Sequence, residues 1–254
     1  MAGLKRTMIP ICITLLALLI VTGGYLFLTS FRNNYRDQSL LRIYPLDTGS
    51  LRSGEPDLPP SDSDIWMIGD SRIARWNLKY FNDGLRIANL GGEGHTSAQV
   101  YYRLKNYLDA YAPSIVILEA GINDLKVIGA DKDLAHSITE NLCRNIDSIR
   151  HLCVRENISL IIMNVFPVGK IEPARRLVWN KYANEAIIMT NRKLLSYCDE
   201  KTVFCLDAYS LLSADAKTVN PEYRYDFLHI NAKGYEILSE ALSEKINVIK
   251  DKKQ

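Results

Sequence analysis

Five short apolar segments alternate with longer amphipathic segments after residue 63, and this alternation constrains the fold more than any other feature. The five segments are DIWMIGD (64–70), LRIANL (85–90), SIVILEAG (114–121), ISLIIMN (158–164) and TVFCLD (202–207). Their apolar residues are nearly continuous, which is typical of strands buried on both faces of a sheet. Strands that alternate with helices form parallel sheets through right-handed crossovers. We therefore predict a three-layer α/β/α domain of the doubly wound, flavodoxin-like type with a five-stranded parallel sheet.

The segments between these strands have the apolar spacing of amphipathic helices. Helices are predicted within residues 96–111, 133–157 and 180–200, and a last helix is predicted from Asn231 onward. The apolar stripe of that last helix consists of Ala232, Tyr235, Leu238, Leu242, Ile246 and Ile249. Residues at this spacing lie on one face of a helix, so the stripe is expected to cover the sheet.

An uncharged segment precedes the predicted domain. Met8 to Leu28 (MIPICITLLALLIVTGGYLFL) contains no charged residue, and about 20 such residues in a helix cross a bilayer. The run is longer than the apolar part of a signal peptide and has no convincing cleavage site after it. We therefore predict a transmembrane anchor at residues 8–28, preceded by a short tail at residues 1–7. The chain is expected to be a single-pass membrane protein.

Basic residues lie on both sides of this anchor, so their count does not decide its orientation. A very short N-terminal tail with a large C-terminal domain favours a domain on the non-cytoplasmic side. Residues 29–63 end in GEPDLPPSDSD and are predicted to form a polar, irregular linker. Residues 64–254 have the length of one ordinary domain. The net charge of +2 gives no support for a nucleic-acid partner.

The cysteines and histidines show no metal-binding spacing, and no cofactor is expected. Cys12 lies in the anchor, and Cys143 and Cys153 are too far apart on one predicted helix to form a disulfide. Cys198 and Cys205 flank a predicted helix-to-strand turn, where both a disulfide and two free thiols are compatible with the sequence. The glycines at 91–94 do not complete a dinucleotide fingerprint.

Polar residues cluster where predicted strands end. These are Gly69-Asp70-Ser71 after the first strand, Gly91, Gly92 and Gly94 after the second, Asn123 and Asp124 after the third, and Asp226 with His229 before the last helix. In an open α/β sheet, ligands bind beyond the carboxyl ends of the strands. Each residue also has an ordinary structural interpretation, because serine commonly caps helices and asparagine and glycine commonly form turns.

Taken together, the four clusters supply the groups that acyl transfer requires. A serine needs a base to become nucleophilic, the base needs an acid to orient it, and the oxyanion needs donors. The ordered blocks GDS (69–71), N-x-G-x-x-G (89–94), G-x-N-D (121–124) and D-x-x-H (226–229) resemble those of the GDSL or SGNH family of serine esterases and lipases. The resemblance covers residues 64 to about 248.

This resemblance implies a role for each matching residue. Ser71 would be the nucleophile, His229 the general base and acid, and Asp226 the residue that orients His229. The amides of Ser71 and Gly94 and the side chain of Asn123 would form the oxyanion hole.

The chain departs from the family pattern near the expected catalytic positions. Arg72 replaces the leucine of the naming motif, His95 stands where many relatives carry aspartate, and Ile230 stands where proline is frequent. Arg72 and His95 are expected to influence substrate preference.

Three functions are compatible with these residues. The first is a membrane-anchored esterase that hydrolyses small acyl esters, such as O-acetyl groups on glycans or lipid esters, through an acyl-serine intermediate. The second is an O-acyltransferase that uses the same triad on an envelope glycan. The third is a non-catalytic glycan-binding or assembly protein. The sequence leaves the acyl chain, the alcohol and the oligomeric state open.

Overall fold

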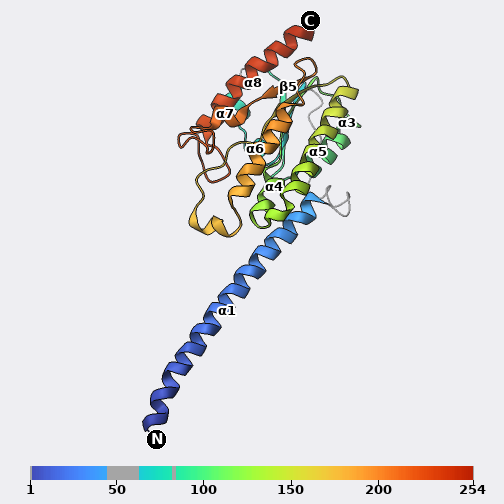
Figure 1. Cartoon of the computed structure of the whole chain (residues 1–254). Coiled ribbons are helices and arrows are strands. Elements are labelled where there is room, and N and C mark those ends of the chain that lie inside the picture. The colour runs from blue at the N-terminus through green and yellow to red at the C-terminus, as the bar shows by residue number, and fades with distance from the viewer. Residues whose placement is uncertain (1, 45–62, 82–83, 254) are drawn as a thin grey trace.

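A five-stranded parallel sheet forms the centre of the domain (Figure 1). The computed structural model describes residues 2–44, 63–81 and 84–253. The strands are β1 (Ile65–Gly69), β2 (Ile87–Gly91), β3 (Ile115–Glu119), β4 (Ser159–Met163) and β5 (Val203–Leu206). Their order is β2-β1-β3-β4-β5, and every neighbouring pair is parallel. The predicted flavodoxin-like fold is confirmed.

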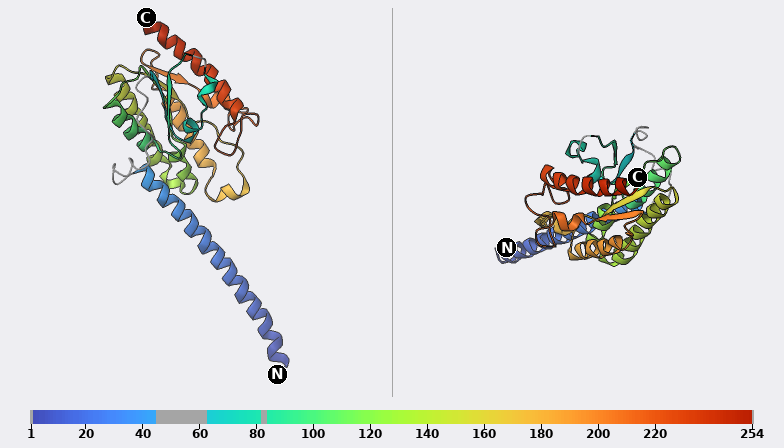
Figure 2. Two further views of the ribbon diagram at one scale, coloured as in Figure 1. Left: turned by 180° about the vertical axis from the view of Figure 1, so that it is seen from behind. Right: turned by 90° about the horizontal axis from the view of Figure 1, so that it is seen from above.

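Helices cover both faces of the sheet (Figures 1 and 2). The helices are α1 (Ala2–Ile43), α2 (Ser71–Ala74), α3 (Ser97–Leu108), α4 (Ile122–Leu125), α5 (Ala135–Arg155), α6 (Lys181–Leu195), α7 (Ala208–Leu212) and α8 (Ala232–Lys253). Short 3-10 helices occur at η2 (Leu78–Tyr80), η3 (Lys126–Gly129), η4 (Lys132–Leu134) and η5 (Pro173–Leu177). Helices α3, α5 and α6 pack on one face, and α7 and α8 pack on the other.

The alternation of side chains along each strand explains these two cores. On β1, Ile68 belongs to the core under α3, α5 and α6, whereas its neighbour Met67 belongs to the core under α8. Strands β1, β3 and β4 are buried along their whole length. A strand covered on both faces has no polar face, which is why the five segments are nearly continuous in apolar residues.

Helix α1 corrects the predicted boundary between anchor and linker. It runs without a break from Ala2 to Ile43, so the prediction of an irregular linker is wrong for residues 29–43. The rest of the predicted linker, residues 45–62, lies outside the described residues. The reason for the helix is tertiary, because Ser39 and Ile43, four residues apart on one face, are buried against the domain.

The other end of α1 projects away from the domain (Figure 1). Its large apolar side chains from Ile11 to Phe27 are exposed. The segment Ile11–Ile43 includes a stretch long and apolar enough to cross a membrane. At the domain end, α1 contacts α3, α4 and η3, which lie at the carboxyl edge of the sheet. The helix therefore meets the domain at the edge where the predicted site lies.

Ile43 should contribute measurably to the stability of the domain. Its side chain is 1% exposed, and truncation of a buried isoleucine to alanine costs about 2–5 kcal/mol. We expect Ile43→Ala to lower the melting temperature of the full chain in detergent by at least about 4 °C. Tryptophan fluorescence reports this transition, because all three tryptophans lie in the domain. Leu41→Ala, at an exposed position of the same helix, is the control, and equal melting temperatures for both variants would contradict the packing of α1.

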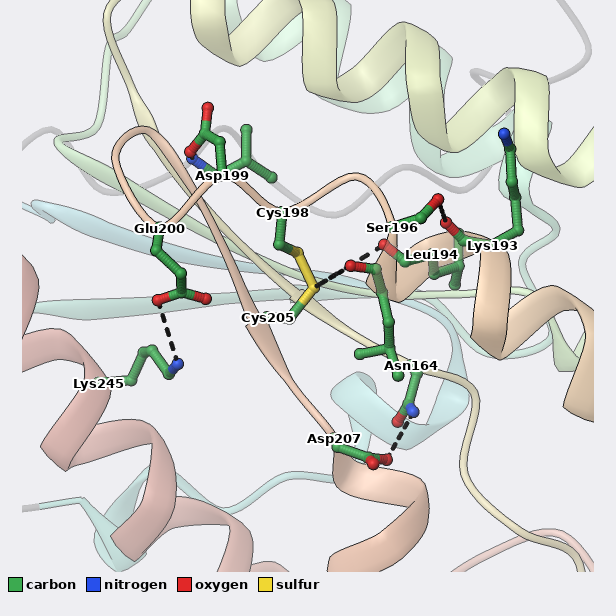
Figure 3. The surroundings of a disulfide bond; sticks show 12 residues. Asn164, Lys193, Leu194, Ser196, Cys198, Asp199, Glu200, Cys205, Asp207 and Lys245 are labelled. Atoms are coloured by element: carbon green, nitrogen blue, oxygen red, sulfur yellow. Dashed lines mark hydrogen bonds and ion pairs between the residues drawn. A yellow bond between two sulfur atoms is a disulfide. The ribbon is translucent and has the colours of Figure 1, made fainter.

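A disulfide joins Cys198 to Cys205 between the end of α6 and β5 (Figure 3). Their Cα atoms are 5.8 Å apart, a normal separation for a disulfide. The Asp199 carboxylate lies within this short loop and accepts hydrogen bonds from the amides of Lys201, Thr202 and Val203. Cys143 and Cys153 are buried free thiols. The structure thus resolves the alternative that the sequence left open in favour of the disulfide.

Candidate active site

Ser71 lies immediately beyond the carboxyl end of the central strand β1. The strand ends at Gly69, where a Cβ atom would collide with the carbonyl oxygen of Glu119 on the neighbouring strand. Asp70 follows as the N-cap of α2, and its Oδ1 accepts from the amide of Arg72 at 2.9 Å. Glycine therefore permits the close approach of β1 and β3, and the cap fixes the turn that presents Ser71.

Ser71, His229 and Asp226 form a continuous hydrogen-bonded chain. The Oγ atom of Ser71 is 3.0 Å from Nε2 of His229, and Nδ1 of His229 is 2.8 Å from Oδ2 of Asp226. These contacts let a serine hydroxyl transfer its proton to an imidazole that a carboxylate orients. Ser71 is 7% exposed, so only a small part of this residue is accessible to solvent.

Asp226 is held in the charged form by its surroundings. Burial alone would raise its pKa, but hydrogen bonds from the His229 ring and from the amides of Leu228 and His229 outweigh burial and lower the pKa. The two amides donate to Oδ1 at 2.7 and 2.8 Å, which leaves Oδ2 for the ring. A carboxylate fixed in this way selects the imidazole tautomer with the proton on Nδ1.

Two contacts fasten the segment that carries Asp226 and His229. The amide of Gly169, in the loop after β4, donates to the carbonyl of Phe227 at 2.8 Å. The Nε atom of Arg72 donates to the carbonyl of Leu228 at 3.1 Å. The histidine segment is far from Ser71 in the sequence, and these bonds connect it to the loops beyond β1 and β4.

Arg72 has a structural position rather than a ligand-facing one. Its side chain has no exposed surface, and Nη1 donates to Oε1 of Glu119 at 3.3 Å. Burial and the neighbouring Asp70 raise the pKa of Glu119 well above its usual range, whereas Arg72 lowers it. A fully buried guanidinium cannot touch a substrate, so the predicted influence of Arg72 on substrate preference would have to act through the residues that Arg72 contacts.

Asn123 contacts the loop after β2, and its side-chain amide is oriented by two partners. Its Nδ2 donates to the carbonyl of His95 at 3.0 Å, and its Oδ1 accepts from Nζ of Lys126 at 2.8 Å. An amide nitrogen carries two hydrogens, so one N–H remains after the bond to His95. Lys126 cannot accept a hydrogen bond, so its contact requires the oxygen of Asn123 on that side. The donor and acceptor roles of these two partners therefore fix the orientation of the amide.

Gly94 supplies the second backbone amide of the predicted oxyanion hole. Its φ angle of +69° is one that residues with a Cβ atom rarely adopt. Within the part of the chain that the structure describes, the amides of Ser71 and Gly94 donate to no protein acceptor. The amides of Ser71 and Gly94 and the second N–H of Asn123 thus have capacity for a further acceptor.

An open cleft adjoins the histidine. It has a volume of about 440 Å³, and its lining includes Arg75, Tyr80, Tyr225, His229 and Tyr235. Arg75 is paired at the rim with Glu93 through two hydrogen bonds of 2.8 and 3.1 Å. Among the described residues, no group of three or more histidine, cysteine or acidic side chains is arranged to bind a metal.

His95 lies beneath the oxyanion region next to two arginines. Its Nδ1 is 3.2 Å from Nη1 of the fully buried Arg103. Burial, followed by the positive charges of Arg103 and Arg42, lowers the pKa of His95 to about 4. The neutral ring can accept from Arg103, whereas a protonated ring would oppose it. His95 therefore acts as an uncharged packing partner at neutral pH.

His95 should make the folded state sensitive to mild acid. Because its folded pKa is lower than that of an unfolded histidine, the unfolded chain binds more protons as the pH falls from about 6.5 to about 4. Stability present above pH 6.5 is lost over this window. Lowering the pH should therefore reduce the free energy of unfolding, and we expect this reduction to be smaller in His95→Gln by on the order of 2 kcal/mol. This figure allows for the partial exposure of the ring. Denaturant unfolding at pH 7 and pH 4.5 measures this effect, with the exposed His136→Gln as control. An unchanged pH dependence in His95→Gln would refute it.

The fold and this geometry define a three-layer α/β/α domain with a hydrogen-bonded serine, histidine and aspartate beyond the carboxyl ends of its strands. The sequence profile of the GDSL-like lipase/acylhydrolase family matches residues 67–237. The chain belongs to this family of GDSL-like lipases and acylhydrolases.

Individual known proteins resemble the chain at sequence identities below 30%. An N-acylneuraminate cytidylyltransferase of Escherichia coli O18:K1:H7 is 27% identical over 190 residues, which are 72% of this chain and 40% of that protein. The match therefore spans less than half of that relative. A Streptococcus pneumonia structure, provisionally described as a platelet activating factor, is 21% identical with a TM-score of 0.62, covering 91% of this chain and 98% of the other. A GDSL-like lipase from Bacteroides thetaiotaomicron is 22% identical with a TM-score of 0.60, covering 79% and 95%. At these identities the two structures support the fold alone.

Two residues near the site were missed by sequence reasoning. Lys126 orients Asn123, and the signal available was its position three residues after Asn123, one turn further along the chain. Arg42 lies next to Gly94, but it belongs to the segment that was predicted to be an irregular linker. Both are cations beside residues of the predicted oxyanion hole, Lys126 at Asn123 and Arg42 at Gly94.

Proposed function

We propose that the chain is a membrane-anchored serine esterase that hydrolyses small acyl esters through an acyl-serine intermediate. The observation that carries this proposal is the hydrogen-bonded chain from Ser71 through His229 to Asp226, with contacts of 3.0 and 2.8 Å. Membership in a family of ester hydrolases supports the same reaction. Family membership also disfavours the third alternative, a non-catalytic binding protein.

In the proposed reaction, Oγ of Ser71 attacks the ester carbonyl while Nε2 of His229 takes the hydroxyl proton. Asp226 holds the ring and stabilises the imidazolium that forms. The negatively charged oxygen of the tetrahedral intermediate accepts hydrogen bonds from the Ser71 and Gly94 amides and from the Asn123 side chain. His229 then gives its proton to the departing alcohol, which leaves an acyl-serine. A water molecule, deprotonated by His229, attacks this acyl group and restores Ser71.

The substrate class rests on the dimensions of the cleft and on one relative. The cleft beside His229 is about 440 Å³ and open to solvent, which suits a short acyl group on a larger alcohol. The relative named an N-acylneuraminate cytidylyltransferase acts on an acylated sugar by its name. We therefore place O-acetyl groups on glycans ahead of lipid esters.

The proposed location is a membrane surface on the non-cytoplasmic side. The exposed apolar side chains of α1 support insertion of its N-terminal half into a bilayer. The disulfide between Cys198 and Cys205 supports an oxidising compartment. Membrane vesicles of known orientation test this arrangement, since protease should degrade the domain only when it is added to the non-cytoplasmic face. Extraction of the intact full chain without detergent would refute the anchor.

Acyl-chain profiling of the full chain in detergent tests the activity. We expect nitrophenyl acetate to be hydrolysed faster than esters of long acyl chains, and a fluorophosphonate probe to label Ser71. Release of nitrophenol without free acetate in the presence of a sugar would instead indicate the acyltransferase alternative. Absence of both turnover and labelling in the folded protein would refute the esterase.

A further inference from the structure

Arg42, the penultimate residue of α1, lies beside Gly94. A Cβ atom added at Gly94 would lie 3.1 Å from Nη2 and 3.3 Å from Nη1 of Arg42. The guanidinium therefore rests against the glycine whose amide belongs to the predicted oxyanion hole. This arginine comes from the helix that extends toward the membrane rather than from the α/β domain.

The backbone of Arg42 is fixed where it meets the domain. Its carbonyl accepts from Oγ1 of Thr96 at 2.8 Å, and Thr96 is buried at the start of α3. The next residue, Ile43, is 1% exposed in the core. The last turn of α1 is thus held to the domain by the Thr96 hydrogen bond and by the burial of Ile43. Arg42 itself is exposed. An exposed guanidinium on an anchored backbone is well placed to receive a ligand.

The charge of Arg42 reaches the groups around the oxyanion region. It contributes to the lowered pKa of His95, after burial and Arg103, and to the lowered pKa of Lys126, after burial. Among the described residues, no carboxylate lies within ion-pair distance of Arg42. Arg75, which lines the cleft beside His229, is in contrast paired with Glu93. Arg42 is therefore a cation near the site that, among the described residues, has capacity for an external anion.

The bilayer that holds α1 does not supply this anion. Arg42 lies 14 residues beyond Leu28, and that length of helix rises about 21 Å. A headgroup at the end of the membrane span is too distant for a guanidinium to contact. The anion must instead approach with the molecule that enters the site.

We propose that Arg42 is a substrate-binding residue that selects acyl esters carrying an anionic group, a carboxylate or a phosphate, over neutral esters. The inference rests on the proposed esterase function. A guanidinium presents paired donors that match the two oxygens of either anion. Selectivity of the hydrolase domain thus depends on a residue contributed by the helix that joins it to the membrane.

A pair of esters that differ in charge tests this role in the full chain in detergent. The anionic member is 4-acetoxybenzoate, and the neutral member is its methyl ester. We expect Arg42→Gln to lower the ratio of kcat/KM for the anionic over the neutral ester roughly tenfold, mainly through KM, because a charge-assisted bond is lost. Arg42→Lys should retain part of the ratio. Arg36→Gln, which removes an arginine paired with Asp37 on the same helix, should leave it unchanged.

Further measurements distinguish recognition of the anionic group from an effect of Arg42 on the reaction itself. The phosphate analogue 4-acetoxyphenyl phosphate shows which anion Arg42 favours, and higher salt should weaken the preference for either. An equal loss of kcat/KM on the charged and neutral esters would mean that Arg42 acts on the developing oxyanion, and it would overturn the proposal. An unchanged ratio in Arg42→Gln would also overturn it.

A binding measurement keeps this test independent of turnover. Calorimetry on Ser71→Ala gives the dissociation constants of both esters without hydrolysis. Tighter binding of the anionic ester that disappears in the double variant Ser71→Ala/Arg42→Gln would support the proposal even if the wild-type chain hydrolysed neither ester. Equal binding of the two esters by Ser71→Ala would refute it, whatever the outcome for the esterase.

Discussion

Ser71→Ala and His229→Ala should each abolish nearly all esterase activity. The two residues are 3.0 Å apart and are proposed to act as one unit. In serine hydrolases the loss of either member costs on the order of a million-fold in turnover. Turnover of nitrophenyl acetate by each purified variant measures the effect, and the fluorophosphonate probe should no longer label Ser71→Ala.

Two matched variants exclude a general effect of substitution. Ser148→Ala and His151→Ala change the same residue types on α5, where Ser148 is half-buried and His151 is exposed, and both should retain full activity. Asp226→Asn should cost less than His229→Ala, since it misorients the ring without removing it. If either Ser71→Ala or His229→Ala kept more than roughly a tenth of the activity, the proposed mechanism would be wrong.

Asn123→Ala should lower turnover by about 10²–10³ and change KM much less. The side chain is 5% exposed, and its amide is oriented by His95 and Lys126. A donor of this kind strengthens its bond mainly as charge develops on the carbonyl oxygen, so its loss appears in kcat. Measuring kcat, KM and melting temperature on one preparation separates catalysis from folding.

Asn164→Ala is the matched control for this prediction. Asn164 is also buried at the carboxyl end of a strand, and its amide likewise has a partner on each side, Asp207 and Tyr209. Its loss should lower stability and leave kcat nearly unchanged, because its partners lie beyond β5 and in α7. If Asn123→Ala behaved like Asn164→Ala, with lower stability and normal turnover, Asn123 would have only a structural role.

The sheet could be predicted because its strands are constrained on both faces. Residues such as Ile117 on β3 must be apolar wherever helices cover the sheet, so the pattern is local and visible in the sequence. The parallel arrangement then brings the loops after β1, β2 and β3 to one edge without any knowledge of side-chain contacts. The proximity of Ser71 and Asn123 follows from topology, while their chemical roles remain predictions.

The features that were missed depend on contacts between distant parts of the chain. Residues 29–43 are rich in polar and charged side chains, and contacts with the domain, among them the burial of Ser39 and Ile43, stabilise them as helix. The burial of Arg72 depends on Glu119, a residue on another strand. No local pattern in the sequence reports either partner. Such contacts determine where the charges near the serine lie, and composition alone does not.

The unbroken course of α1 has a mechanical consequence for an anchored enzyme. A flexible tether would let the domain take many distances and tilts relative to the bilayer. A continuous helix restricts both, so the part of α1 beyond Leu28 acts as a stiff strut between membrane and domain. From Leu28 to Ile43 the strut adds about 22 Å of standoff. Because α1 joins the domain beside α4, the carboxyl edge of the sheet is on the side from which the strut arrives (Figure 1). In the proposed arrangement, the enzyme would reach esters inside a layer of fixed depth above the bilayer and would miss those farther out.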